Sequence, residues 1–310
     1  MTLAAVVRGR LGLAWNAARD VCRKGKVNIG GALALDPAVR VERGQAVTVR
    51  PDAPGDAARR RREAAARIVF EDAHVVVIDK PSGVSSVPWE RGERGTAIDL
   101  VRDAWRSRGL DAARMPVHVV HRLDRATSGL LVFAKTSLAM RTLRGMLRKH
   151  DVSRVYLCIA HGRVEARTFR SSLVRDRGDG YRGSARGRKG SDDGKPSVTH
   201  VRPIEILPAA TLCEVTLETG RTHQIRIHLA EAGHPVVGDD VYSRDWQRAG
   251  NEALPAGRLL LHARRLSFAH PVTGRIVDLE REPPRDFLAD LERLRRAPGS
   301  PPGPPGRAEL

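Results

Sequence analysis

The sequence contains no long hydrophobic run. No apolar stretch approaches the roughly 18–20 residues of a membrane-spanning helix, and the apolar segment 3–7 is too short for the core of a signal peptide. We therefore expect a cytoplasmic protein without a membrane anchor. The chain has 310 residues, of which 41% are hydrophobic, and this is enough for one large domain and one small one.

Cysteine is also scarce. Cys22, Cys158 and Cys213 lie far apart and form no C-x-x-C pair, which argues against a disulfide framework and against a zinc site. We expect three reduced, partly buried thiols.

Two common catalytic motifs are absent. The sequence has no G-x-x-x-x-G-K-[ST] and no G-x-S-x-G segment, which excludes the simplest nucleotide-hydrolysing and serine-hydrolase classes. His118 and His121 are three apart on an extended segment, and the pair at 223 and 228 is five apart on a helix, so neither pair shares a face that could hold a metal. We expect a reaction that uses no cofactor and no metal.

Negative charge is limited. The chain has 54 Lys and Arg against 36 Asp and Glu, a formal net charge of +18. Such an excess favours a polyanionic partner, with RNA or DNA ahead of an anionic membrane.

The composition divides the chain into parts. The first fifty residues carry nine basic and three acidic residues, and helix-like "LAWNAARDVCRKGKV" and strand-like "GQAVTV" predict a small basic α/β unit at residues 1–52. Two prolines, a glycine and four consecutive arginines follow, so we place a linker at residues 53–67. The large domain is expected at residues 68–292. The Pro/Gly-rich stretch 293–310 is expected to be disordered.

Short apolar runs in the large domain predict several strands, including "VVVI", "PVHVV", "LLVFAK", "VYLCIAHG" and "TLCEVTLETG". The Arg/Gly-rich segment 170–195 is expected to be a long flexible surface loop. Because strands outnumber helices and few strand-helix-strand units recur, we predict an α+β fold with a mixed, mostly antiparallel central sheet flanked by helices.

Two segments predict helices beside this sheet. "SLAMRTLRGMLRKH" has a helical pattern, and four of its side chains are expected to face inward. These are Leu138, Leu143, Met146 and Leu147. "HQIRIHLAEAG" predicts a short helix with Thr222 as its N-cap and Gly233 at its end.

The loop "HRLDRATSG" (121–129) places one acid, Asp124, among basic residues and between two predicted strands. Its carboxylate could simply cap the turn through nearby backbone amides. Alternatively, in a dry cleft, a neighbouring arginine would keep it ionised as a nucleophile or base. Arg226, which follows a strand and a glycine turn, is the candidate for that arginine.

Six separated segments resemble the RluA-type RNA pseudouridine synthases, in that family's order and spacing. They are "DKPSG", "HRLDRATSG", "RVYLCIAHG", "GKPSVTHV", "GRTHQIRIHLAEAGHPVVGDDVY" and "LLHARRLSFAHPVTG". The N-terminal unit resembles the small RNA-binding module named after ribosomal protein S-four, although its first helix lacks the usual Arg-Leu-Asp start.

The resemblance implies roles for particular residues. Asp124 would be the catalytic residue, Tyr156 would contact the target base and help remove its C5 proton, and Arg226 would pair with Asp124. Arg122 would contact RNA and help keep the base out of the stack. Without the resemblance, Tyr156 is better explained as a core aromatic, and Arg226 could be an ordinary surface residue of its helix. Further candidates for substrate binding, each with a purely structural alternative, are Lys80, Arg221, His223 and Gln224.

Isomerisation of uridine is redox-neutral and adds no atoms, which agrees with the expectation of no cofactor. Asp124 would either attack C1′ of the ribose or remove a proton from C2′, and the sequence does not distinguish these routes. We expect a monomer acting on structured RNA, with ribosomal RNA favoured over transfer RNA. The alternative is a non-catalytic RNA-binding or RNA-folding protein with the same fold. A glycosidase is disfavoured because it would need a second acid, and none was recognised beside Asp124.

Overall fold

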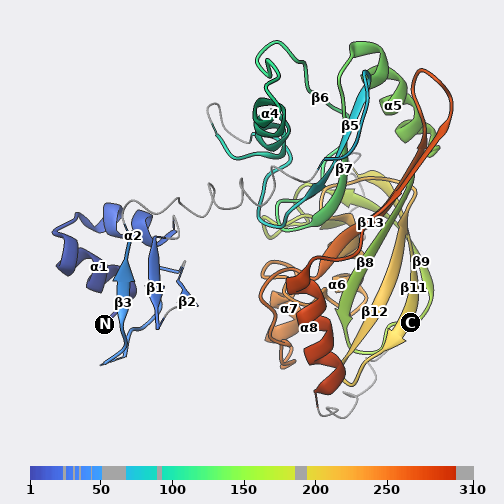
Figure 1. The fold of residues 1–310 in the computed structure, drawn as a ribbon. Coiled ribbons are helices and arrows are strands. Elements are labelled where there is room, and N and C mark those ends of the chain that lie inside the picture. The colour runs from blue at the N-terminus through green and yellow to red at the C-terminus, as the bar shows by residue number, and fades with distance from the viewer. Residues whose placement is uncertain are drawn as a thin grey trace. The chain divides into compact units, whose positions relative to one another are not determined.

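A computed structural model describes residues 1–23, 26–30, 32–34, 36–42, 44–50, 68–88, 93–185 and 194–297. The chain divides into two compact units, Met1–Ala66 and Arg67–Leu310 (Figure 1). The predicted linker 53–67 lies outside the described residues. No helix in the described part of the chain is long and apolar enough to cross a membrane.

The N-terminal unit pairs two helices with a small antiparallel sheet. Its elements are α1 Leu3–Leu11, α2 Trp15–Arg23, β1 Val27–Ile29, β2 Ala32–Leu33 and β3 Val47–Val49. Leu3, Val7 and Cys22 are fully buried in its core. Gly12, in the left-handed conformation with φ 63°, ends α1. The helix α1 was not anticipated, and Val27 lies in a strand instead of ending the helix predicted before it.

The second unit is built on one eleven-stranded sheet. Its strands are β4 Ile68–Glu71, β5 Val75–Lys80, β6 His118–Val119, β7 Ser128–Ala134, β8 Ser153–His161, β9 Arg167–Val174, β10 Gly183–Ser184, β11 Lys195–Ile206, β12 Ala210–Leu217, β13 Leu261–Ala269 and β14 Ile276–Glu280. The order is β10-β9-β11-β12-β8-β13-β7-β5-β4, with β14 on β13 and β6 on β7. Of these pairings only β7 with β13 is parallel, so the prediction of a mixed, mostly antiparallel sheet is confirmed.

Helices cover this sheet. They are α4 Ala97–Ser107, α5 Ser137–Lys149, α6 Gln224–Glu231, α7 Arg244–Arg248 and α8 Arg285–Arg296. In Figure 1, α4 and α5 lie near β5 and β6, while α7 and α8 lie near β12. Because α8 continues to residue 296, the predicted start of the tail at 293 falls inside a helix. Residues 298–310 lie outside the described residues.

The buried face of α5 differs from the prediction at its first turn. Leu143 is buried, and Met146 and Leu147 pack on the same core, but Leu138 is 54% exposed. The inward position is taken one residue later by Ala139, which is fully buried. Neighbouring residues of a helix are turned by about 100° from each other, and here Ala139 faces the core while Leu138 faces outward, so the prediction for Leu138 was wrong.

The segment 170–195 is more ordered than predicted. Strand β9 runs along β11, and β10 folds back on β9, while residues 186–193 lie outside the described part. The β9 side chains are largely polar and exposed, so the strand is formed by its backbone ladder and leaves little hydrophobic pattern. The segment 178–183 reads G-x-G-x-x-G, but it lies in this hairpin and not between a strand and a helix, as dinucleotide binding would require.

Candidate active site

The loop that carries Asp124 joins β6 to β7, and hydrogen bonds to its main chain hold it in place. Ser86 donates to the Leu123 carbonyl at 2.7 Å and accepts from the Leu123 amide at 3.0 Å. The Thr127 amide donates to the Asp124 carbonyl oxygen at 3.1 Å. The main-chain carbonyl of Asp124 therefore closes the turn, and its carboxylate is not needed for this. The Asp124 side chain is 21% exposed and faces a cavity.

Arg226, on α6, lies beside this carboxylate but is held by another acid. Its Nη1 is 3.7 Å from Asp124 Oδ2. Its Nε and Nη2 donate to the two carboxylate oxygens of Asp239 at 2.6 and 2.8 Å. The expected Asp124–Arg226 pair is present, but the closer partner of Arg226 is Asp239, which the sequence analysis missed.

Asp239 is the second acid that the sequence analysis did not recognise, although the quoted "VVGDDVY" contains it. Its side chain is fully buried and also accepts the amides of Val241 and Tyr242 at 2.9 and 3.0 Å. Burial alone would raise the pKa of Asp239, but the hydrogen bonds and charge of Arg226, together with the backbone amides of Val241 and Tyr242, lower it. Four N–H groups occupy the oxygens of Asp239, and Asp239 is not among the residues that line the cavity of Asp124, so it is not placed to act as a second catalytic carboxylate of a glycosidase.

His223 lies between Asp124 and the hydroxyl of Tyr242. Its Nε2 is 3.9 Å from Asp124 Oδ1, and its Nδ1 hydrogen-bonds the Tyr242 hydroxyl at 2.9 Å. His223, with φ 58°, occupies the N-cap of α6, so the prediction of Thr222 at that position was wrong. Burial lowers the pKa of His223 and raises that of Tyr242 to about 12. The Arg226 guanidinium lies over the Tyr242 ring, 5.0 Å from its centre.

Tyr156 lies on β8, where it pairs with Ala263 of β13 and Val215 of β12. Its side chain is 6% exposed and lines the same cavity as Asp124. Burial raises the pKa of the Tyr156 phenol against the opposing charge of Arg154, and the charge of Asp124 adds to the rise. A protonated phenol and a carboxylate thus share one cavity.

This cavity has a volume of about 580 Å³. Asp124 supplies the single carboxylate among its described lining residues. Six arginines also line it, namely Arg122, Arg144, Arg148, Arg154, Arg221 and Arg226. The cavity therefore carries a strong positive field around one acid.

Residues 74–231 match the family model described as RNA pseudouridylate synthase. The chain belongs to the RNA pseudouridylate synthase family. This confirms the resemblance to the RluA-type synthases and makes the protein an isomerase.

Several relatives of this synthase are similar over most of their length. "Ribosomal large subunit pseudouridine synthase D" of Zymomonas mobilis is 37% identical over 84% of this chain and 82% of the relative. "Uncharacterized RNA pseudouridine synthase YhcT" of Bacillus subtilis is 38% identical over 74% and 71%. The structure of "Human RNA Pseudouridylate Synthase Domain Containing 4" superposes with a TM-score of 0.61 at 25% identity, covering 77% of this chain and 97% of that one.

Lys80 of the synthase, a candidate for substrate binding with a structural alternative, has structural contacts. It is fully buried and does not line the cavity. Its Nζ donates to the carbonyls of Pro81, Val84 and Arg125 at 3.0, 2.8 and 3.2 Å. Burial lowers the pKa of Lys80 to about 7. Lys80 therefore joins the end of β5 to the loop of Asp124, and a phosphate could reach it only by displacing these carbonyls.

The other candidate residues of the synthase do line the cavity. Gln224 is buried and donates to the Val198 carbonyl and Thr199 hydroxyl at 2.9 and 2.8 Å, which anchors α6 to β11. Arg221 donates through Nε to the Pro196 carbonyl at 3.0 Å. Arg122 is exposed at the rim.

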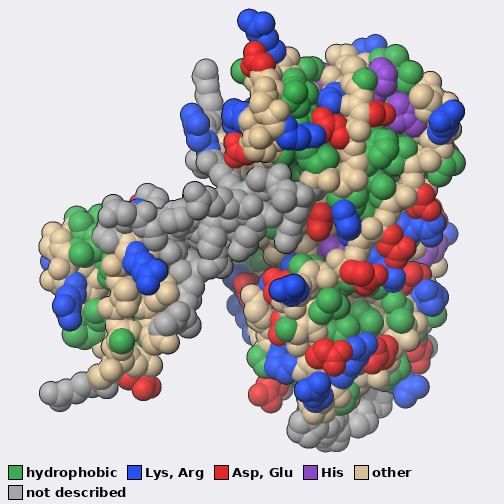
Figure 2. Space-filling model, in the orientation of Figure 1, with side chains coloured by type: hydrophobic (Ala, Val, Ile, Leu, Met, Phe, Trp, Pro, Cys, Tyr) green, Lys and Arg blue, Asp and Glu red, His purple; other side chains and the backbone are tan. Residues whose placement is uncertain are grey.

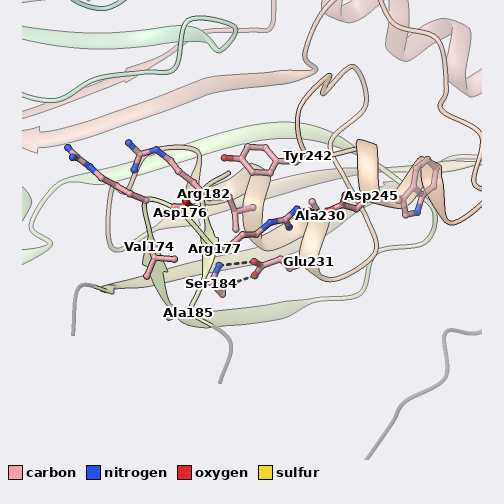
Figure 3. Close-up of a pocket in the computed structure, with 13 residues that line it drawn as sticks. Val174, Asp176, Arg177, Arg182, Ser184, Ala185, Ala230, Glu231, Tyr242 and Asp245 are labelled. Atoms are coloured by element: carbon pink, nitrogen blue, oxygen red, sulfur yellow. Dashed lines mark hydrogen bonds and ion pairs between the residues drawn. The ribbon is translucent and has the colours of Figure 1, made fainter. Parts of the chain in front are cut away.

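A second cavity of about 560 Å³, lined in part by Tyr242, lies between the β9–β10 hairpin, α6 and α7 (Figure 3). Glu231 accepts the Ser184 amide there at 2.8 Å, which ties the hairpin to α6. The hairpin is thus fixed beside the helix that carries Arg226.

Proposed function

We propose that this pseudouridine synthase isomerises uridine in large-subunit ribosomal RNA, with Asp124 as the group that acts on the ribose. The observation that carries the proposal is the cavity in which one carboxylate faces Arg226 at 3.7 Å and shares the space with Tyr156. The printed names of relatives such as the Zymomonas mobilis synthase support ribosomal RNA as the substrate class.

The proposed reaction balances within the substrate. The N1–C1′ bond breaks as Asp124 either attacks C1′ or takes the C2′ proton, and the two routes remain alternatives. The freed uracil turns inside the cavity and C5 bonds to C1′, either as the Asp124–C1′ bond breaks or, on the other route, as Asp124 returns the proton to C2′. The C5 proton is then removed, with the Tyr156 phenol that lines the cavity taking part, and N1 of the base gains a proton. Bonds and protons are exchanged but nothing is oxidised or reduced.

Arg226 is positioned for this reaction because Asp239 holds it. Two short hydrogen bonds to Asp239 fix the guanidinium, and its remaining Nη1 faces Asp124 across 3.7 Å. The acid thus has an opposite charge beside it, while no close hydrogen bond to Arg226 occupies its oxygens. Both oxygens remain available to the ribose.

The charge of the cavity suits a nucleic acid. On the face drawn in Figure 2, basic and acidic side chains are interspersed, whereas the cavity carries six arginines and one acid. Phosphate contacts supply most of the affinity for RNA. They would offset the few kcal/mol that eversion of a uridine costs.

The N-terminal unit supplies a second surface suited to RNA. Trp15 is 44% exposed, and the guanidinium carbons of Arg8 and Arg19 lie 5.0 and 5.9 Å from the centre of its ring. An exposed indole between arginines can stack on an unpaired base while the cations meet phosphates.

The test is D124N in cells that lack the gene. Carbodiimide mapping of pseudouridine across cellular RNA should show a site that wild-type protein restores and D124N does not, and purified D124N should keep its RNA affinity within about tenfold because phosphates dominate binding. A restored site in transfer RNA would replace the ribosomal substrate. If deletion removes no site, the non-catalytic RNA-binding function becomes the better account.

A further inference from the structure

Arg154 is a buried cation without an acid. It lies at the second position of β8, is 6% exposed, and lines the cavity of Asp124. It makes no ion pair within the described part of the chain. Its Nη2 donates to the carbonyls of Leu217 and Glu218 at 3.4 and 2.9 Å, and its Nε has no partner.

The other arginines that line this cavity have a carboxylate partner or are exposed to solvent. Arg226 has two carboxylates, and Arg144 is exposed and donates to the Val119 carbonyl. Arg154 alone combines deep burial with the absence of a carboxylate, among the arginines that line this cavity. Burial also lowers its pKa. A buried guanidinium without a counter-ion is unfavourable unless an anion joins it during function.

We infer that Arg154 is the receptor for a phosphodiester of the everted nucleotide, inside the cavity that holds the target uridine. The inference rests on the proposed function. Arg154 and Tyr156 are two apart on β8 and point to the same face, roughly 7 Å apart along the strand. The phenol would therefore meet the base while the guanidinium meets the backbone of the same or the adjoining nucleotide.

The turn before α6 keeps the space that this arginine needs. A Cβ added to Gly220 would lie 2.7 Å from Arg154 Nη1. Any larger residue at 220 would push the guanidinium away from its position. Gly220 also begins the segment that carries Arg221 and His223, so the proposed phosphate receptor and the catalytic cluster share one turn.

The experiment compares R154Q, R154K and the matched control R163Q. Arg163 is exposed, lines neither cavity, and follows the other end of β8, roughly 30 Å along the strand. Affinity for an unmodified transcript of large-subunit ribosomal RNA is measured over a range of potassium chloride concentrations. Losing one phosphate contact should reduce the slope of log affinity against log salt by about 0.7 in R154Q, while R154K and R163Q keep the wild-type slope.

The same variants are assayed for isomerisation of that transcript. R154Q should lose about 10- to 100-fold in kcat/KM, mainly through KM, which corresponds to the loss of a hydrogen bond between charged groups. If R154Q does not fold, as judged by thermal melting, G220A tests the inference with the charge retained and should reproduce the smaller slope.

A folded R154Q with the wild-type slope and KM would overturn the inference, because a purely structural arginine would leave both unchanged. Failure of the proposed function is separate. If wild-type protein formed no pseudouridine in the transcript, the ribosomal assignment would fall. The binding slopes would still decide whether Arg154 holds a phosphate.

Discussion

Replacement of Asp239 by asparagine tests the buried pair that positions Arg226. The Asp239 carboxylate accepts four N–H groups, two from Arg226 and two from the backbone. An asparagine offers one oxygen and one NH₂, so at least one buried donor would face another donor. Breaking a buried ion pair on one side costs about 3–5 kcal/mol, which is a large part of the roughly 5–15 kcal/mol that stabilises an ordinary domain.

The substitution should also affect the reaction. Without the carboxylate of Asp239, the nearest acid to Arg226 is Asp124 at 3.7 Å. We expect the guanidinium to move onto Asp124 and occupy its oxygens with a charged hydrogen bond worth about 1.5–3 kcal/mol. This predicts a fall in kcat of about 10- to 100-fold, with RNA affinity little changed.

Asp240 provides the matched control, since it is the next residue and is exposed. D240N should stay within about 0.5 kcal/mol of wild type. Urea unfolding at neutral pH gives the stability of each variant, and single-turnover isomerisation gives the rate. If D239N unfolds within about 1 kcal/mol of D240N and retains the wild-type kcat, the reasoning about the Asp239–Arg226 pair is wrong.

Three further predictions follow from the structure. Burial lowers the pKa of three histidines to about 4, namely His161, His228 and His262. Because the unfolded chain takes up protons near pH 6.5 and the folded one only near 4, stability should fall as pH drops through that window, and each of these histidines contributes up to about 1.4 kcal/mol per pH unit. A urea midpoint that is equal at pH 7 and pH 5 would contradict this. Y156F keeps the ring and removes the hydroxyl proposed to take part in the C5 proton transfer, so kcat should fall by about 10²- to 10⁴-fold while affinity is unchanged; an unaltered kcat would remove Tyr156 from proton transfer. G129A places a Cβ 2.2 Å from the Ala263 carbonyl oxygen at φ 109°, and thermal melting should show a loss of roughly 3 kcal/mol or more, whereas a wild-type melting temperature would mean that β7 and β13 can separate at no cost.

The sheet was predictable where its strands are apolar. β7 is buried along its whole length, and β12 alternates near its end, so each carries a hydrophobic pattern that the sequence displays. β9 was not predicted because its side chains lie mostly in water and leave no hydrophobic pattern. Backbone hydrogen bonds to the neighbouring strands hold it in the sheet. α1 was not predicted because the apolar segment 3–7 at its start was considered only as the possible core of a signal peptide.

The site was predictable as a set of residues but not as a set of contacts. Asp124, Tyr156 and Arg226 lie in recognisable segments, and the fold brings them to one cavity. The pairing of Arg226 with Asp239 depends on how the chain returns after α6, which no local pattern records. Lys80 and Arg154 were misjudged or missed because charged side chains are seldom fully buried, and their burial follows from tertiary packing.

The three cysteines give the protein internal reporters of local opening. Cys22 lies in the core of the first unit, and Cys158 and Cys213 face each other on β8 and β12 of the second. All three are fully buried, and burial raises the pKa of Cys22, so an alkylating reagent meets them only when the surrounding structure opens. Labelling rates followed by peptide mass would therefore time the unfolding of the two units separately in one sample, without any engineered probe.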